Sequence, residues 1–121
     1  ISTNLVGHSL RMPVILAPIG SMQDFVEGAG IAPTIAASEF GILHMISSTC
    51  MPGLEEVAKS VNYPKLFQLY VRGDQNWVDD QIKNAIEFNY SGIYNAYISC
   101  IQFRLFCTEQ DREFKMPMKY T

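Results

Sequence analysis

The segment Leu66-Phe67-Gln68-Leu69-Tyr70-Val71 decides how this chain of 121 residues folds. It is short, rich in apolar and aromatic residues, and typical of a buried β-strand. Successive side chains of a strand point to opposite faces, so Phe67, Leu69 and Val71 are expected to pack beneath helices. Gln68 and Tyr70 then share the other face. Burying them without partners costs a few kcal/mol, so they bind either a polar ligand or neighbouring strands and water.

The same kind of strand recurs along the chain and alternates with helical patterns. Apolar residues at helical spacing follow each of the first three strands, and Gly41 supplies a left-handed stop for the first helix. Asp74 or Asn76 is expected to cap the third helix. The predicted strands are Val14–Ala17, Ile42–Ile46, Leu66–Val71 and Ile93–Ile98, and the predicted helices cover residues 31–40, 54–61 and 76–89.

Strands that alternate with helices indicate an α/β fold made of repeated βα units around a parallel sheet. Two architectures use that pattern. A doubly wound sheet closes with four or five strands, whereas a (β/α)₈ barrel needs eight units and about 250 residues. Four units in 121 residues would be about half a barrel. In either case ligands bind at the carboxyl ends of the strands.

The composition excludes several classes of protein. Nine Lys and Arg residues against twelve Asp and Glu residues give a net charge of −3 without a basic cluster, which argues against nucleic-acid binding. The apolar runs are far shorter than the roughly 20 residues of a membrane span. Cys50, Cys100 and Cys107 form no CxxC pair, so neither a disulfide framework nor a zinc site is expected. We expect a cytoplasmic protein.

Other candidate sites have a simpler structural interpretation. Gly28-Ala29-Gly30 resembles the start of a dinucleotide-binding fingerprint, but Pro33 stands near the third glycine position, so a plain helix-entry loop is favoured. His44 lies inside a predicted strand and His8 near the start of the chain. Both are expected to be structural imidazoles. Asp79 and Asp80 are expected to be surface charges on their helix.

Several blocks of sequence, in order and in register, resemble the FMN-dependent 2-hydroxy-acid oxidase and dehydrogenase family, which includes glycolate oxidase, lactate oxidase and mandelate dehydrogenase. The resemblance covers residues 1–92, whereas residues 93–121 diverge. It implies one incomplete barrel domain over 1–121, with about the first four βα units of a (β/α)₈ barrel and FMN as cofactor. The blocks are Ser2-Thr3-x-Leu5-x-Gly7-His8 with Met12-Pro13-Val14, Ala17-Pro18-Ile19-Gly20-x-Met22-Gln23, Ile46-Ser47-Ser48, Leu54-Glu55-Glu56-Val57 and Phe67-Gln68-Leu69-Tyr70-Val71.

The resemblance also implies roles for individual residues. Pro18, Ile19 and Gly20 match a segment whose backbone lies against the flavin ring, where glycine permits a close approach. Ser47 matches a serine that hydrogen-bonds the flavin, and Gln68 matches a glutamine that reads its pyrimidine edge. Tyr70 matches a tyrosine that contacts the substrate, a 2-hydroxy acid of the lactate or glycolate class that is oxidised to the 2-oxo acid.

Residues 93–121 depart from the family pattern. A Thr-Val-Asp motif is replaced by Asn95-Ala96-Tyr97-Ile98-Ser99, and only Glu109-x-Asp111 echoes a later arginine-rich stretch. The family's lysine, catalytic histidine and second substrate arginine come from later strands, so no catalytic residue is assigned here. We therefore expect the 121-residue chain to bind FMN poorly, to turn over no 2-hydroxy acid and to associate through open strand edges.

Two functions from different classes remain open on the sequence. The favoured one is the N-terminal part of an FMN-dependent 2-hydroxy-acid oxidoreductase, which would be a homo-oligomer at full length. The alternative is a degenerate, non-catalytic remnant that acts, if at all, as a partial or self-associating module. A third and weaker interpretation is another βα protein that binds a phosphate-bearing ligand.

Overall fold

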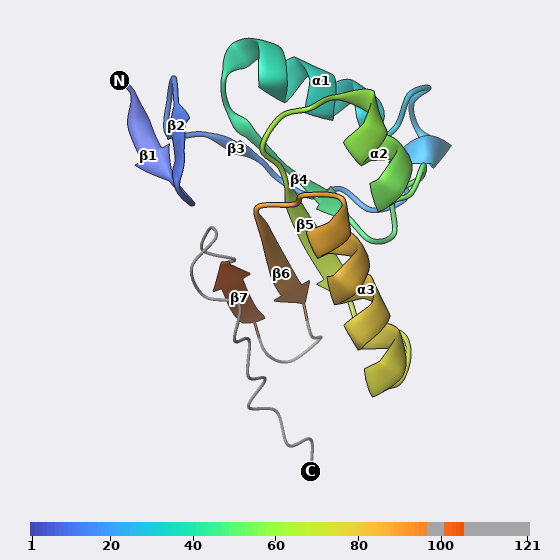
Figure 1. The fold of residues 1–121 in the computed structure, drawn as a ribbon. Helices are drawn as coiled ribbons and strands as arrows, with labels where there is room; N and C mark the ends of the chain where they lie inside the picture. Colours follow the sequence, from blue (N-terminus) through green and yellow to red (C-terminus); the bar gives the residue numbers. More distant parts are fainter. Residues whose placement is uncertain (97–100, 106–121) are drawn as a thin grey trace.

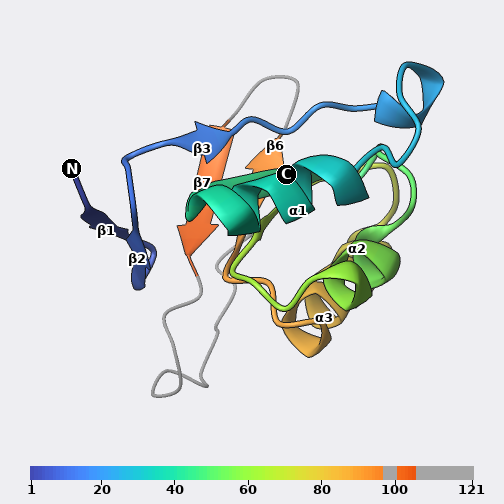
Figure 2. The same ribbon diagram turned by 90° about the horizontal axis from the view of Figure 1, so that it is seen from above.

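The computed structural model describes residues 1–96 and 101–105, which form a mixed α/β fold (Figure 1). A five-stranded sheet has the order β3-β4-β5-β6-β7, and a separate two-stranded hairpin precedes it. Three helices pack on one face of the sheet. Figure 2 shows this arrangement from above. Within the described residues, no helix is long and apolar enough to cross a bilayer.

The elements follow the predicted alternation with small shifts at their ends. The strands of the main sheet are β3 (Ile15–Leu16), β4 (Leu43–Ser47), β5 (Leu66–Tyr70), β6 (Gly92–Ala96) and β7 (Ile101–Leu105). The helices are the short 3₁₀ helix η1 (Met22–Asp24), α1 (Ile31–Phe40), α2 (Leu54–Ser60) and α3 (Gln75–Glu87). Gly41 ends α1 in the left-handed conformation, as predicted, with φ of 69°.

Strands β3, β4, β5 and β6 are parallel neighbours in sequence order, which confirms the predicted parallel sheet. Strand β7 was not predicted. It pairs antiparallel with β6, so that Gly92 lies opposite Leu105 and Ala96 opposite Ile101. A run of parallel βα units alone therefore does not describe the sheet. Tyr97, Ile98 and the predicted motifs beyond Leu105 lie outside the described residues.

The two faces of the sheet carry different cores. On the helix face, Ile46, Phe67, Leu69 and Ile93 pack with Val57 of α2 and with Val78 and Ala85 of α3. On the other face, Leu43 and Leu66 pack against Leu10, and all three are at most 1% exposed. The alternation predicted for Phe67 and Leu69 is thereby confirmed, and it leaves Gln68 on the face opposite the helices.

Leu10 belongs to a hairpin that the sequence did not reveal. Strands β1 (Thr3–Leu5) and β2 (His8–Leu10) pair antiparallel around Val6 and Gly7, both of which have positive φ. Two such central residues make a turn whose twist suits a two-residue hairpin. Val6 packs against the Leu10 cluster, and the His8 Nε2 atom lies 2.8 Å from Ser91 Oγ. The hairpin therefore covers the amino-terminal end of the open face.

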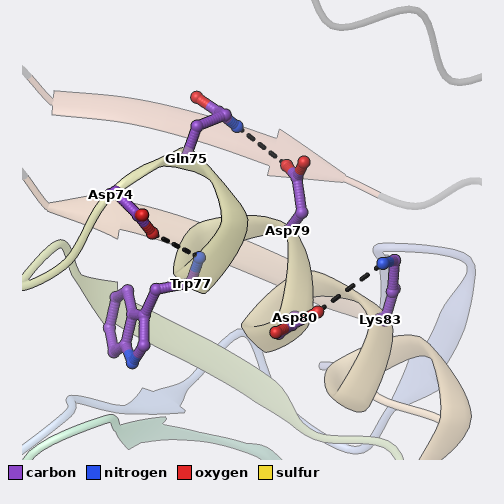
Figure 3. Close-up of polar contacts among 6 residues, drawn as sticks. All are labelled: Asp74, Gln75, Trp77, Asp79, Asp80 and Lys83. Atoms are coloured by element: carbon purple, nitrogen blue, oxygen red, sulfur yellow. Dashed lines mark hydrogen bonds and ion pairs between the residues drawn. The ribbon is translucent and has the colours of Figure 1, made fainter.

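Helix α3 begins directly after Asp74, which is one of the two residues predicted to cap it. The Asp74 side chain accepts a hydrogen bond of 3.0 Å from the backbone N–H of Trp77 (Figure 3). This bond satisfies one of the N–H groups that a helix start leaves unpaired. Asp79 accepts a bond from Gln75, and Asp80 pairs with Lys83 at 3.5 Å. Both carboxylates therefore make local contacts along the helix surface.

His44 is a buried structural imidazole, in line with the expectation from its place in a strand. It is 2% exposed, and its Nδ1 atom lies 2.8 Å from Thr34 Oγ1 on α1. Thr34 Oγ1 donates to Gly30 O at 2.7 Å, so His44 Nδ1–H is the donor in the contact with Thr34. Burial lowers the pKa of His44 to about 4. The imidazole is therefore neutral at physiological pH.

This burial makes folding sensitive to acid. Below the ordinary pKa of 6.5 the unfolded chain binds a proton at His44, whereas the folded chain does so only near pH 4. The contribution of the neutral His44 to the free energy of unfolding is fully present above pH 6.5. It falls by up to about 3 kcal/mol as the pH is lowered to 4. We predict that urea unfolding from pH 7 to 4 shows a shallower loss of stability in H44Q than in the unmodified chain.

The matched control is H8Q, because His8 is half-buried in the hairpin and lies outside the helix-face core. H8Q should keep the steep acid dependence of the unmodified chain. Parallel pH profiles for H44Q and the unmodified chain would contradict the assignment.

Candidate functional site

The polar edge that the sequence predicts lies where strands β4 and β5 end. Ser47 and Gln68 are direct neighbours in the register of the two strands. The pairing continues past the end of β4, because Ser48 N–H donates to Gln68 O at 2.8 Å and Tyr70 N–H donates to Ser48 Oγ at 3.0 Å. Ser47, Gln68 and Tyr70 are thus brought together on two neighbouring strands.

Gln68 presents a buried amide with free hydrogen-bonding capacity. The residue is 7% exposed. Its backbone carbonyl bonds Ser48, whereas no hydrogen bond to its side-chain amide occurs within the part of the chain that the structure describes. Tyr94 of β6 is its register neighbour on the other side. An amide in this position has two donors and an acceptor to offer to a ligand.

Ser47 is buried beneath the turn that follows β4. Its side chain is 2% exposed, and its Oγ lies 2.9 Å from Thr49 Oγ1. The backbone N–H of Thr49 also donates to Ser47 Oγ at 3.2 Å. Ser47 and Thr49 therefore form a local hydroxyl pair at the carboxyl end of β4. The run Ser47-Ser48-Thr49 follows a predicted strand, but no sequence pattern indicates that the first and last of its hydroxyls pair.

Gly20 lies directly against this hydroxyl pair. A Cβ atom added to Gly20 would overlap Thr49 Oγ1 and would lie 3.8 Å from Ser47 Oγ. The neighbouring Ser21 N–H donates to Thr49 O at 3.1 Å. Whether Gly20 also leaves room for a flavin ring stays a prediction, but the contact with Thr49 gives an internal reason for a glycine at this position.

The loop between β3 and α1 is fastened to the turn after β4 at two further points. Gln23 Oε1 accepts a bond of 2.9 Å from Met51 N–H, and Gly30 N–H donates to Met51 O at 3.2 Å. Gly30 forms the N-terminal boundary of α1, so the Gly28-Ala29-Gly30 stretch is a helix-entry loop, as expected. A Cβ at Gly30 would lie 3.2 Å from Cys50 Sγ, which is tight packing against a free thiol.

The remaining predicted residues lie at the more open part of the edge. Pro18 is half-buried, whereas Ile19 is 53% exposed and Tyr70 is 38% exposed. Tyr70 follows Gln68 by two positions on β5, so both residues belong to the face opposite the helices. Ile19 and Tyr70 therefore leave an apolar and a phenolic side chain exposed at this edge.

A cavity of about 550 Å³ lies between α2 and α3 and reaches the end of β4, where Ser47 and Ser48 line it. None of Gly20, Thr49, Gln68 and Tyr70 lines it, and Phe67, which does, belongs to the helix-face core. Within the described residues no group of His, Cys, Asp and Glu side chains could hold a metal ion. The cavity is lined by Ser47, Ser48, Cys50, Gly53, Leu54, Glu55, Glu56, Phe67, Gln81, Asn84, Glu87 and Phe88.

Comparison with known proteins identifies the family. The family model of FMN-dependent dehydrogenases matches residues 1–97, and the chain belongs to this family. FMN is the family's cofactor. Similar proteins include the L-lactate dehydrogenases of Pectobacterium atrosepticum and Serratia proteamaculans, each 33% identical over 85 residues. The match covers 70% of this chain and 22% of each relative, so the chain spans about a fifth of the length of these relatives.

Solved structures show the same fold at lower identity. The chain is similar to (S)-mandelate dehydrogenase, a monotopic membrane protein, with a TM-score of 0.76 and 20% identity over 86% of this chain and 28% of that one. It is also similar to a mandelate oxidase variant that carries a C4a-OH-FMN adduct, with a TM-score of 0.76 and 22% identity over 86% of this chain and 32% of that one.

The contact between Gly20 and Thr49 can be tested by a double-mutant cycle. G20A should lower the free energy of unfolding by roughly 1 to 3 kcal/mol, because the added methyl group overlaps Thr49 Oγ1. T49A removes that oxygen and leaves the Thr49 Cβ at an ordinary distance of 3.6 Å. G20A should therefore cost much less in the T49A background. Chemical denaturation of the four chains measures the coupling, and strictly additive effects would contradict the contact.

Proposed function

We propose that this chain forms the N-terminal part of a (β/α)₈ barrel and one side of the flavin site of an oxidoreductase that converts an L-2-hydroxy acid of the lactate or glycolate class to the 2-oxo acid. The buried, unbonded amide of Gln68 carries the proposal. Family membership and the similar fold of flavoenzymes support it. FMN, when bound, supplies the acceptor for the two electrons of such an oxidation.

Gln68 fits the edge of a flavin for a physical reason. The amide of Gln68 has no protein partner among the described residues, and its atoms are not fully buried, so they stay open to a ligand or to water. A ring edge that alternates N–H donors with carbonyl acceptors satisfies both ends of such an amide. Gln68 is therefore assigned to the pyrimidine edge of FMN, and the pairing with β4 and β6 holds its backbone in place.

Pro18, Ile19 and Gly20 are assigned to the face of the flavin ring. They belong to the loop that hydrogen bonds from Ser21 and Gln23 fasten to the turn after β4. An exposed Ile19 beside a half-buried Pro18 offers apolar surface to an aromatic ring. Ser47 completes the flavin-binding set, and its hydroxyl lies in the network with Thr49.

Tyr70 is assigned to the substrate. Its 38% exposed side chain lies one row further along the strand than Gln68, toward the open end. A phenol there can donate to the carboxylate or hydroxyl of a 2-hydroxy acid. Both histidines of the chain make contacts elsewhere, His8 near Ser91 and His44 near Thr34, so no catalytic base is assigned to this chain.

We retain two expectations about the whole protein as part of this proposal. The first is self-association into a homo-oligomer at full length. The second is a cytoplasmic location, with which the free thiol of Cys50 agrees.

The proposal is tested by titrating the 121-residue chain with FMN and following the quenching of flavin fluorescence. We expect weak binding, because the described residues contact only one side of the cofactor. Q68M keeps the length of the side chain and removes its hydrogen bonds. It should weaken binding by tenfold or more, since two hydrogen bonds of about 0.5 to 1.5 kcal/mol each are lost.

The matched control is Q81M, because Gln81 lines the cavity between α2 and α3 instead of the polar edge. It should leave the affinity for FMN unchanged. Equal affinities of Q68M and the unmodified chain, or no binding of FMN at all, would refute the proposal.

A further inference from the structure

A buried polar pair joins helix α1 to strand β4. Thr34 is 1% exposed and His44 is 2% exposed. The Thr34 Oγ1 atom lies 2.8 Å from His44 Nδ1 and 2.7 Å from the carbonyl oxygen of Gly30. That carbonyl can only accept, so the single hydroxyl proton of Thr34 is directed to Gly30 and the imidazole donates to Thr34. With an unprotonated Nδ1, one of the two buried acceptors would stay unpaired.

A polar pair at this place contributes a defined geometry more than stability. Two apolar side chains of the same shape would be about as stabilising in a contact between a helix and a sheet. They could, however, slide or rotate past each other, whereas two hydrogen bonds in series fix the side chains at set distances. The bonds from His44 to Thr34 and from Thr34 to Gly30 therefore set where the first turn of α1 lies on β4.

Gly30 connects this pair to the turn that follows β4. Its N–H donates to Met51 O at 3.2 Å, and a Cβ atom at Gly30 would lie 3.2 Å from Cys50 Sγ. Gly30 is therefore held by α1 through its carbonyl and by the turn through its N–H. A shift of the first turn of α1 would lengthen the bond to Met51 or press Gly30 against the thiol.

The loop that ends at Gly30 begins with the residues assigned to the flavin ring. Near its start, Ser21 N–H donates to Thr49 O at 3.1 Å, and further along Gln23 Oε1 accepts from Met51 N–H at 2.9 Å. Gly30 supplies a third point of attachment to the same turn. A loop attached at three points has less conformational freedom to lose when a ligand orders it than a loop attached at two.

We propose that His44 and Thr34 are positioning residues for the flavin-binding loop, because their hydrogen bonds fix Gly30 and thereby hold the loop from Pro18 to Gly30 against the turn after β4. Neither residue contacts the flavin. This inference rests on the proposed flavin site, and it gives the buried imidazole a part in that site without a role in proton transfer.

The first test measures amide hydrogen exchange of the 121-residue chain in the absence of FMN. H44L replaces the imidazole with an apolar side chain, and it should speed exchange at the N–H groups of Gly30 and Met51 by about three- to tenfold, the usual effect of one hydrogen bond. Exchange at Phe88, whose N–H donates to Asn84 O in α3, should be unchanged. H44N retains an N–H donor near the position of Nδ1 and should restore slow exchange.

The partner residue provides a second pair of variants that does not alter the imidazole. T34V keeps the shape of the side chain and removes both of its hydrogen bonds, so it should speed exchange as H44L does. T34S keeps the hydroxyl and should restore slow exchange. The matched control is H8L, because His8 also lies 2.8 Å from a serine hydroxyl but belongs to the β1–β2 hairpin. It should leave exchange at Gly30 unchanged.

The second test is an FMN titration of the same variants. H44L and T34V should weaken binding by about three- to tenfold, whereas H44N, T34S and H8L should bind within about twofold of the unmodified chain. Because the substituted side chains do not touch the ligand in this account, rescue by H44N and T34S distinguishes the loss of the hydrogen bonds from a change of volume in the core.

Three results would overturn the inference. The first is unchanged exchange at Gly30 in both H44L and T34V. The second is equally faster exchange at Gly30 and Phe88, which would indicate general loss of stability. The third is unchanged FMN affinity in H44L and T34V while Q68M weakens binding. Since exchange is measured without FMN, it decides whether the pair fixes Gly30 even if Q68M has no effect and the proposed flavin site fails.

Discussion

The burial of Phe67 and Leu69 beneath the helices fixes the orientation of strand β5, and the polar edge depends on that orientation. Both side chains are at most 2% exposed and pack with residues of α2 and α3. A shift of one residue in the register would move them to the opposite face and would bury Gln68 among apolar helices. The core therefore holds an amide on the far face, where neighbouring strands provide it with little to bond.

A polar site at the carboxyl end of this sheet face also depends on closure of the amino-terminal end of the same face. The β1–β2 hairpin places Leu10 against Leu43 and Leu66, which seals the amino-terminal end of this face with apolar contacts. At the carboxyl end, the loop from Pro18 to Gly30 is bonded to the turn after β4. One end of the face is thus a packed core and the other is polar and partly open. This division is the arrangement found in βα proteins that bind ligands at strand ends.

Local patterns were enough to predict most of this arrangement. The period of two in β5, the left-handed stop at Gly41 and the cap at Asp74 are each encoded within a few residues, and the structure confirms them. The hairpin at Val6 and Gly7 and the antiparallel strand β7 were missed. A β-branched residue such as Val6 is not expected at positive φ, and it is tolerated here because it packs on the Leu10 cluster. The reason for the positive φ of Val6 therefore lies in contacts outside its own turn.

The residues of the candidate site also divide into those that a local pattern indicates and those that only the folded chain brings together. Gln68 could be singled out from the sequence because alternation places an amide where an apolar residue would suffice. The pairing of Ser47 with Thr49, and the contact of Gly20 with both, depend on a turn and a loop that meet only in the folded chain. A polar residue next to a strand end has no local signal that separates a ligand contact from a hydroxyl bonded inside the protein.

The central claim is that FMN binds at the polar edge of β4 and β5 and not in the cavity between α2 and α3. Mapping of amide chemical shifts by NMR as FMN is added tests this most directly. The account predicts that the largest changes occur at Gly20, Thr49 and the side-chain amide of Gln68, with little change in the β1–β2 hairpin. Changes confined to Glu55, Gln81 and Asn84, which line the cavity, would contradict it.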